Sequence, residues 1–267
     1  MVRSLYTAAT GMEAMQTKLD VISNNLANIN TTAFKKGRAN FEDLFYRHNA
    51  YPGALDPQQN PTATGTSIGL GTRVQSVQTK FTQGAFADTG GQYDVAIEGK
   101  GFFQVQDASG TGTLYTRAGN FSVNATGQLV VGSAQTGRIV QPNIVIPVDA
   151  TDVSITADGR VLVKQPGSTQ QTQAGQLQLA TFLNPEGLLK MGENMYALTD
   201  AAGQATPNNP GTQGVGVLRQ GFLESSNVEA VQELIDLITT QRSFEFNSQA
   251  IQASDQILTQ IANLRRA

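Results

Sequence analysis

Apolar residues at seven-residue spacing mark both ends of the chain. In residues 3–29, one apolar row recurs at every seventh position and a second row follows three residues later. Such an a/d stripe over nearly four heptads predicts a helix with a coiled-coil seam. The two rows are Leu5, Met12, Leu19 and Leu26, and Ala8, Met15, Ile22 and Ile29.

The C-terminal stretch, roughly residues 226–265, predicts a second and longer helix of the same kind. Ser226 or Asn227 is expected to cap it, with Glu229 in its first turn. Its apolar positions are Leu237, Phe244, Ile251 and Leu258, joined near the end by Ile257, Ile261 and Leu264. Polar residues occupy intervening seam positions, where they either fix the helix register or are simply exposed. These polar residues are Gln241, Ser248 and Asp255.

The lengths of the two predicted helices bear on assembly. A rise of 1.5 Å per residue predicts helices of about 40 Å and about 60 Å. If they pair with each other, the longer helix keeps part of its apolar seam uncovered. Each Leu or Ile left in water forgoes about 1.5–3 kcal/mol. We therefore expect the chain ends to pack against other copies of the chain.

The chain between the helices is predicted to be β-rich. Short alternating apolar runs are separated by Gly, Asn and Asp turns. In residues 152–164, Val153 and Ile155 precede an Ala-Asp-Gly turn and Val161 and Val163 follow it, which predicts a hairpin with one buried face. No helical period intervenes, which argues against a βαβ sheet. The predicted fold is α+β, with paired terminal helices and a mainly antiparallel β domain looped out between them.

A proline-containing stretch precedes the β-rich region. Residues 48–66 contain Pro52, Pro57 and Pro61 and few apolar side chains. Two interpretations stay open. The stretch is either a flexible linker or an extended arm that becomes ordered against neighbouring subunits.

Composition narrows the possible functions. Charged residues make up 15% of the chain and the net charge is -3, so no strong positive field for nucleic acid is expected. The local basic cluster of Lys35, Lys36 and Arg38 is interpreted as a solvated turn. The chain has no Cys, which excludes disulfides and thiolate metal sites. No apolar run is long enough to predict membrane insertion, and the N-terminus lacks the apolar core of a cleaved signal peptide.

The sequence offers little catalytic chemistry. Residues 65–69 match the G-x-S-x-G nucleophile pattern, but no helix is predicted after Ser67 and no His follows it. His48 lacks further His or Cys ligands for a metal. Acidic residues such as Glu224 and Glu233 are interpreted as solvated faces or caps. We expect no catalytic residue, no cofactor and no metal, although a carboxylate pair acting on a sugar bond stays open.

The terminal motifs resemble those of the bacterial flagellar basal-body rod protein family. Residues 20–36 are similar to the N-terminal signature of flagellar axial proteins, and residues 225–258 are similar to their C-terminal helix. The family usually has Gly where this chain has Ala33. Segments 94–105, 115–123 and 192–198 look like the shared β domain. The matching positions are Asn24, Asn25, Leu26, Ala27, Asn28, Thr31, Phe34, Lys35, Ser226, Asn227, Val228, Gln241, Arg242, Phe244, Glu245, Asn247 and Ile257.

This resemblance implies a division of labour along the chain. Residues 1–35 and 223–267 would be the helices of the assembly core, and residues 76–222 a β-rich outer domain. Residues 36–75 would form an extended or β-hairpin segment, since residues 40–75 look like the region typical of distal rod proteins. The resemblance implies that this segment contacts neighbouring subunits and favours a straight tube.

The resemblance also implies partners and a location. The chain would form a homo-oligomeric helical tube, a stiff hollow drive shaft that transmits torque. Proximal rod proteins and hook protein would adjoin its ends, and P- and L-ring proteins would surround it. The flagellar type III export apparatus would export it without a cleaved signal peptide, and the rod would span the periplasm to the outer membrane.

Three alternatives remain from the sequence. The first is a proximal rod or hook-family axial subunit. The second is a β-architecture carbohydrate-active enzyme, which an acidic cleft with a raised carboxyl pKa would indicate. The third is a fibre adhesin with coiled-coil ends.

Overall fold

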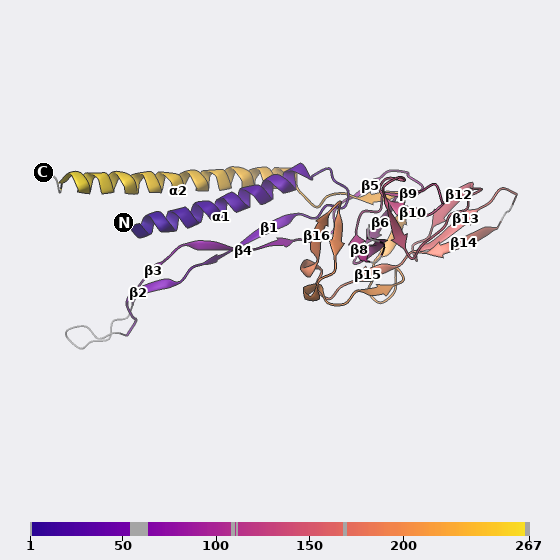
Figure 1. The fold of residues 1–267 in the computed structure, drawn as a ribbon, viewed down its shortest axis with the longest axis horizontal. Helices are drawn as coiled ribbons and strands as arrows, with labels where there is room; N and C mark the ends of the chain where they lie inside the picture. Colours follow the sequence, from indigo (N-terminus) through magenta and orange to yellow (C-terminus); the bar gives the residue numbers. More distant parts are fainter. Residues whose placement is uncertain (1, 54–63, 108–109, 111, 168–169, 265–267) are drawn as a thin grey trace. The chain divides into compact units, whose positions relative to one another are not determined.

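The computed structural model describes residues 2–53, 64–107, 110, 112–167 and 170–264 (Figure 1). These residues form an α+β fold, with one long helix near each terminus and antiparallel strands between the helices. The predicted fold class is confirmed at this level. The proline-containing arm largely lies outside the described residues, since residues 54–63 are not among them.

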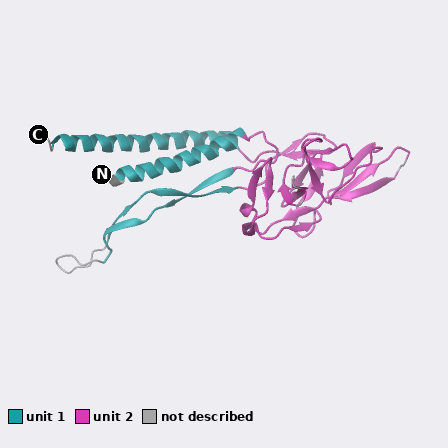
Figure 2. Ribbon diagram, in the orientation of Figure 1, with its two compact units in different colours: residues 1–27, 37–79, 229–267 teal, residues 28–36, 80–228 magenta. Residues whose placement is uncertain are grey.

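The chain divides into two compact units, which Figure 2 colours separately. Unit 1 contains residues 1–27, 37–79 and 229–267. Unit 2 contains residues 28–36 and 80–228. The short segment after the N-terminal helix therefore belongs to the β-rich unit.

Unit 1 consists of two helices and a two-part β ribbon. Helix α1 packs against strands β1 and β4, which pair in antiparallel with a bulge between Asn40 and Phe41. Strands β2 and β3 continue the ribbon as a second antiparallel pair. The elements are α1 Val2–Ala27, β1 Gly37–Asp43, β2 Tyr46–Ala50, β3 Thr66–Gly69, β4 Thr72–Thr79 and α2 Ala230–Leu264.

The helix ends differ from the predicted ones for local reasons. Helix α1 ends at Ala27, just before a run of Asn and Thr residues that favour turns over helix. The predicted cap at Ser226 or Asn227 is wrong, because α2 begins at Ala230. The Asn227 side chain instead bonds to the backbone of unit 2.

Unit 2 is built from antiparallel strands and two short 3₁₀ turns. Its largest sheet has the order β16-β17-β8-β7-β11-β10-β9, with β15 and β18 branching from β7. Strands β12, β13 and β14 form a separate sheet, and β19 pairs with β6 and β20 with β5. The first strands are β5 Phe86–Asp88, β6 Val95–Glu98, β7 Phe102–Gln106, β8 Thr113–Thr116, β9 Phe121–Val123, β10 Leu129–Val131, β11 Arg138–Gln141 and β12 Asp152–Ile155. The later elements are β13 Arg160–Lys164, β14 Gln171–Gln176, β15 Leu179–Thr181, η1 Pro185–Gly187, β16 Leu189–Gly192, β17 Met195–Ala197, η2 Asp200–Ala202, β18 Thr206–Asn208, β19 Val217–Gln220 and β20 Phe222–Glu224.

The alternation of apolar residues explains the core of unit 2. In the predicted hairpin, Val153 pairs with Val163 and Ile155 with Val161, and all four side chains are buried. This prediction is confirmed. A second, smaller cluster is aromatic, with Phe102, Tyr115 and Tyr196 packing edge-on against partly buried Phe81 and Phe182. Unit 2 thus has a closed interior of its own.

Candidate functional site

Helices α1 and α2 pair in antiparallel, and small and polar residues of the two helices meet at several points. The hydroxyl oxygens of Ser4 and Ser254 lie 3.5 Å apart. A Cβ added at Gly11 would lie 3.1 Å from Nδ2 of Asn247, so the backbone of α1 approaches α2 closely there. From one facing pair to the next, the residue number rises by a multiple of seven on α1 and falls by the same number on α2. The heptad is therefore present, but these contacts do not come from the apolar rows that predicted a coiled coil.

Asn25 and Glu233 continue this register at the other end of α1. The Asn25 side chain bonds to Gly37 in the way that a paired strand would. Its Oδ1 accepts the Gly37 N–H at 2.9 Å, and its Nδ2 donates to the Gly37 C=O at 2.9 Å. It also donates to Glu233 Oε2 at 3.2 Å. Both side chains are buried, so the interpretation of Glu233 as a solvated acid is wrong. The amide fixes the start of β1 against the helix pair.

The predicted apolar seam is distributed over several environments. Ala8 and Ile22 are buried, whereas Ile29 lies in a turn beyond the end of α1. Of the polar positions proposed to set register, Gln241 and Asp255 are exposed and Ser248 is half-buried. The half-buried members of the predicted apolar seam are Leu5, Met12, Met15, Leu19, Leu26, Leu237, Phe244, Ile251 and Leu258.

A second apolar face of α2 points away from α1. Val231, Leu234, Ile235 and Ile238 follow the i, i+3, i+4, i+7 spacing of one helix face, and all are exposed, between 45% and 71%. The register pairs the first residue of α1 with Gln256, so later residues of α2 have no counterpart on α1. Ile257, Ile261 and Leu264 in this overhang are exposed. The uncovered apolar surface expected from the helix lengths is therefore present.

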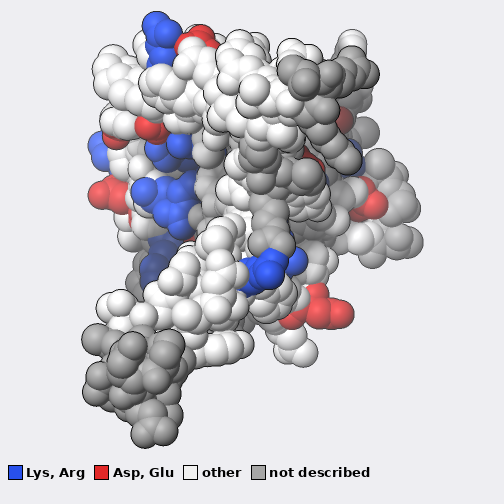
Figure 3. Space-filling model, turned by 90° about the vertical axis from the view of Figure 1, so that its left-hand side faces the viewer, with Lys and Arg blue, Asp and Glu red and all other residues white. Residues whose placement is uncertain are grey.

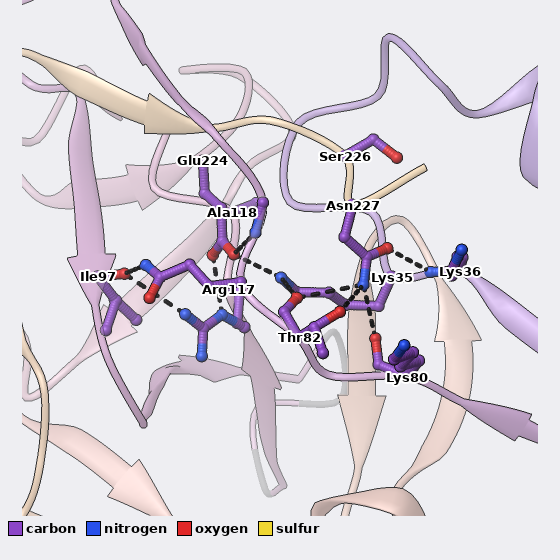
Figure 4. Close-up of polar contacts among 12 residues, drawn as sticks. Lys35, Lys36, Lys80, Thr82, Ile97, Arg117, Ala118, Glu224, Ser226 and Asn227 are labelled. Carbon is purple, nitrogen blue, oxygen red and sulfur yellow. Dashed lines mark hydrogen bonds and ion pairs between the residues drawn. The ribbon is translucent and has the colours of Figure 1, made fainter. Parts of the chain in front are cut away.

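Three charged side chains meet inside unit 2 (Figure 4). Lys35 Nζ and Arg117 Nε both bond to the carboxylate of Glu224, the latter at 2.9 Å. The side chains of Lys35 and Glu224 are fully buried, and Arg117 is 4% exposed. Lys35 also donates to the Thr82 carbonyl at 2.9 Å. The interpretations of Lys35 as part of a solvated turn and of Glu224 as a solvated acid are wrong.

Electrostatics inside this cluster favours the charged carboxylate. Burial alone would raise the pKa of Glu224, but the charges of Arg117 and Lys35 and the hydrogen bonds from Lys35 and the Gly84 N–H hold it below its ordinary value. Burial lowers the pKa of Lys35, and the attraction of Glu224 opposes that effect. Arg117 donates three further hydrogen bonds from Nη1 and Nη2 to the carbonyls of residues 97, 99 and 101. The cluster is thus satisfied by hydrogen bonds and carries one more positive than negative charge.

Asn227 lies beside this cluster and bonds to three backbone sites. Its Oδ1 accepts the Lys36 N–H at 2.8 Å, and its Nδ2 donates to the Lys80 and Thr82 carbonyls at 2.8 and 3.1 Å (Figure 4). Sequence reasoning placed Asn227 in the family motif but missed this role. No local pattern could reveal it, because the partners lie more than 140 residues away.

The other motif positions fall into exposed and buried groups. Asn24, Gln241 and Arg242 are exposed, and Arg242 pairs with Glu245 at 2.9 Å one helical turn later. Asn28 and Phe34 are half-buried. Ala33 keeps a positive φ of 57°, the backbone conformation that the Gly usual at this position would adopt most easily.

The candidate catalytic pattern has the wrong structural context. Ser67 lies within strand β3 rather than on a turn between a strand and a helix. His48 lies in β2, and its ring stacks on Tyr51 at 5.2 Å. Among the residues that the structure describes, no group of three His, Cys, Asp or Glu side chains is placed to hold a metal ion.

Charge is sparse on the face that Figure 3 shows. Most of its described surface is uncharged, and Lys, Arg, Asp and Glu are interspersed in small groups. This pattern matches the low charged fraction of the sequence. Within the described part of the chain, no helix has the length and hydropathy needed to span a membrane.

Comparisons with known proteins match both ends and the middle of the chain. The family model "Flagella basal body rod protein" matches residues 5–35, and "Flagellar hook protein FlgE/F/G D1 domain" matches residues 96–163. "Flagellar basal body rod FlgEFG protein C-terminal" matches residues 219–264. These matches include most of α1, all of α2 and part of unit 2.

Two of the similar proteins cover nearly the full length of the chain. The flagellar basal-body rod protein FlgG of Caulobacter vibrioides is 44% identical over 99% of this chain and 100% of its own length. FlgG of Agrobacterium fabrum is 44% identical over 96% of this chain and 97% of its own length. The flagellar hook protein FlgE of Treponema pallidum is 44% identical over 49% of this chain and 27% of its own length.

Proposed function

The chain belongs to the flagellar basal-body rod protein family, and from this premise we propose that it is a distal rod subunit that assembles through α1 and α2 into a stiff hollow tube. Family membership makes it a structural protein of the flagellar basal body. The assembly route, the distal position and the transmission of torque are the proposal. The single observation that carries the proposal is the second apolar face of α2.

That face needs a partner outside the chain. Its four side chains, Val231, Leu234, Ile235 and Ile238, are 45–71% exposed, so burying them fully gains a part of the about 1.5–3 kcal/mol that a fully exposed side chain would gain. A repeated contact of this size, made by every subunit with its neighbours, supports a polymer. In a rod made of one protein, every subunit has other copies of the chain as neighbours, and these copies are the proposed partners.

The overhang of α2 supports the same proposal. Ile257, Ile261 and Leu264 extend beyond the part of α2 that faces α1. Such an overhang suits contact with helices of the next subunit rather than with the chain's own α1. We infer that the helices form the inner wall of the tube and that unit 2 forms its outer domain.

The β2–β3 ribbon is the segment we propose to stiffen the tube. Every position of β2 is exposed, and Phe45 and Tyr51 beside it are 88% and 65% exposed. Aromatic side chains contribute large contact areas to protein interfaces. Contact between this ribbon and neighbouring subunits would restrict bending, which favours a straight rod over a curved hook.

The proposed partners follow from this role. Proximal rod proteins and hook protein would adjoin the two ends of the tube, and P- and L-ring proteins would surround it. The similarity to a hook protein over half of this chain supports related surfaces at that junction. We propose export by the flagellar type III apparatus and a span from the periplasm to the outer membrane.

Electron microscopy of the concentrated full-length chain tests this proposal. We expect straight tubes from the unmodified chain and none from an Ile235→Asp, Ile238→Asp double variant, because each Asp puts a charge into the proposed contact. Val148→Asp is the matched control, since Val148 is 94% exposed but lies in unit 2. Tubes from the double variant would contradict assembly through α2. Curved tubes from the unmodified chain would indicate the hook side of the family instead.

A further inference from the structure

Residues 28–36, here called the strap, bond to the chain segment that leads to α2. Ala33 N–H donates to the Glu224 carbonyl at 2.7 Å, and Asn227 N–H donates to the Phe34 carbonyl at 3.3 Å. On another side of the strap, Asn194 Nδ2 donates to the Thr32 carbonyl at 3.0 Å. Backbone and side-chain hydrogen bonds therefore join the strap to the rest of unit 2.

The buried side chain of Lys35 anchors the strap. Its ammonium group reaches Glu224 and the Thr82 carbonyl in a fully buried position. Glu224 in turn accepts the Gly84 N–H at 3.0 Å. Asn227 bonds the strap at Lys36 and residues 80–82 at two carbonyls. One polar cluster thus joins the strap, residues 80–84 and residues 224–228.

The three segments that meet at this junction are direct continuations of α1, of β4 and of α2. The strap follows directly on α1, which ends at Ala27. Residues 80–84 follow β4, which ends at Thr79, and residues 224–228 precede α2, which begins at Ala230. The segments that continue from both helices and from the ribbon therefore converge on the same buried charges.

We propose that the strap is a latch, fastened by Lys35, that opens and closes as one cooperative unit and holds together the chain segments that lead to α1, α2 and the β1–β4 ribbon. A partly open latch that kept Lys35 buried but apart from Glu224 would leave its charge unpaired, which is more costly than the closed state or the fully open state, in which Lys35 reaches water. A closed latch keeps the adjoining ends of α1 and α2 near each other, which raises the effective concentration of one helix for the other. The latch is independent of assembly, since it lies within one chain.

Hydrogen exchange of the full-length chain tests whether the latch opens as a unit. The reporters are N–H groups that bond between the strap, residues 80–84 and residues 224–228, namely those of Ala33, Lys36, Lys80, Gly84 and Asn227. In Lys35→Met, we expect all of them to exchange faster together by about tenfold or more. The Val95 and Leu129 N–H groups, which bond elsewhere in unit 2, should keep their rates. Lys100→Met, at an exposed lysine of the same unit, is the matched control.

A second variant tests whether the bonds of Lys35 and Asn227 open together or each affect only their own surroundings. Asn227→Ala should speed the same reporters, and adding it to Lys35→Met should change the rates little further, because the latch is already open. Additive effects, each confined to the contacts of the substituted residue, would overturn the proposal. Uniformly faster exchange throughout unit 2 would also overturn it, since Lys35 would then stabilise only the unit as a whole.

The link to the helices has its own readout. The chain contains no Cys, so a Ser4→Cys, Ser254→Cys variant under a mild oxidant reports how often α1 and α2 meet at their far ends, where the two hydroxyls lie 3.5 Å apart. We expect disulfide formation to slow several-fold when Lys35→Met is added. An unchanged rate would overturn the claim that the latch favours helix pairing.

Discussion

The two units bury their apolar residues to very different extents. Within the described residues, the buried apolar side chains of unit 1 are Ala8, Ala14 and Ile22, whereas unit 2 encloses a large β core and an aromatic cluster. Unit 1 also exposes an apolar face on α2. A unit with its own interior is stable alone, whereas a unit with little interior depends on what covers it. The contrast supports the proposal that unit 1 is the part of the chain that partners complete.

The two units also differ in their buried polar groups. Unit 2 gathers Lys35, Arg117 and Glu224 into a cluster in which every charge has a partner. Unit 1 places small and polar residues between its helices, including the buried Asn25, Glu233 and Thr240. A polar helix interface contributes less stability than an apolar one but specifies register. The following substitutions test this contrast.

The largest effect is expected at the centre of the charged cluster. Glu224→Gln leaves Lys35 and Arg117 buried without a counter-charge and should lower the free energy of unfolding by about 3–5 kcal/mol. Urea denaturation followed by circular dichroism measures this change. Glu98→Gln is the control, because the Glu98 side chain is 52% exposed and its ion pair with Arg219 is long at 3.8 Å. Equal effects in the two variants would contradict the role assigned to Glu224.

Truncation of one leucine in each unit compares the two interiors directly. Leu129→Ala should cost about 2–5 kcal/mol, because Leu129 is fully buried and leaves a cavity. Leu234→Ala on the exposed face of α2 should change the stability of the monomer by less than about 1 kcal/mol but weaken assembly. Denaturation of dilute protein and sedimentation of concentrated protein measure the two quantities. A large loss of monomer stability in Leu234→Ala would show that this face is covered within the chain.

Loss of the Asn25 side-chain bonds should have an intermediate effect on unit 1. Asn25→Leu leaves both backbone groups of Gly37 without this partner and should cost about 1–3 kcal/mol. Hydrogen exchange of the Gly37 N–H reports the change locally, and we expect it to speed up. Asn24→Leu, at the exposed neighbouring position, is the matched control. If both variants exchange alike at Gly37, the bonds of Asn25 do not fix the start of β1.

The smallest expected effect is on how the free energy of unfolding changes at acidic pH. The folded pKa of Glu224 lies below its ordinary value of 4.5, so its contribution to stability is fully present above that pH and is lost as the pH falls through the folded pKa. Stability of the unmodified chain should therefore fall more steeply below pH 4.5 than that of Glu224→Gln. Urea titrations at a series of acidic pH values measure the two slopes. Parallel slopes would mean that Glu224 is not the titrating group.

Periodic elements of the fold were predictable from the sequence because periodicity is local. The spacing of Leu5, Leu19 and Ile22 predicted α1, and the alternation around Val153 and Val163 predicted a hairpin that the structure confirms. The apolar rows did not single out Ser4, Gly11 and Asn25, whose contacts with α2 the structure shows. The sequence also contains Gly11 and Asn25 at positions offset by multiples of seven, and this row meets α2.

The charged cluster was not predictable from local pattern. Lys35 stands beside Lys36 and Arg38, and such a basic run after a helix usually lies in solvent. Its partners Arg117 and Glu224 are brought to it by the sheet topology of unit 2, which no spacing along the chain encodes. Local pattern placed Lys35 in a solvated turn and Asn227 at a helix cap, and the resemblance included both in its motifs without a physical reason. That reason is the joint burial and bonding of residues from distant parts of the chain.

The pairing of Lys35 with Glu224 spans 189 residues, which has a consequence for the order of events during synthesis. Strands close to each other in sequence, such as those of the β12–β13 hairpin, can form as soon as they leave the ribosome. At 5–20 residues per second, Lys35 waits roughly 10–40 s for Glu224 to be made. Contacts of such high contact order form late and slowly. A nascent chain thus spends most of its synthesis with its amino-terminal segment unattached, and becomes a complete folding unit only when nearly all of it exists.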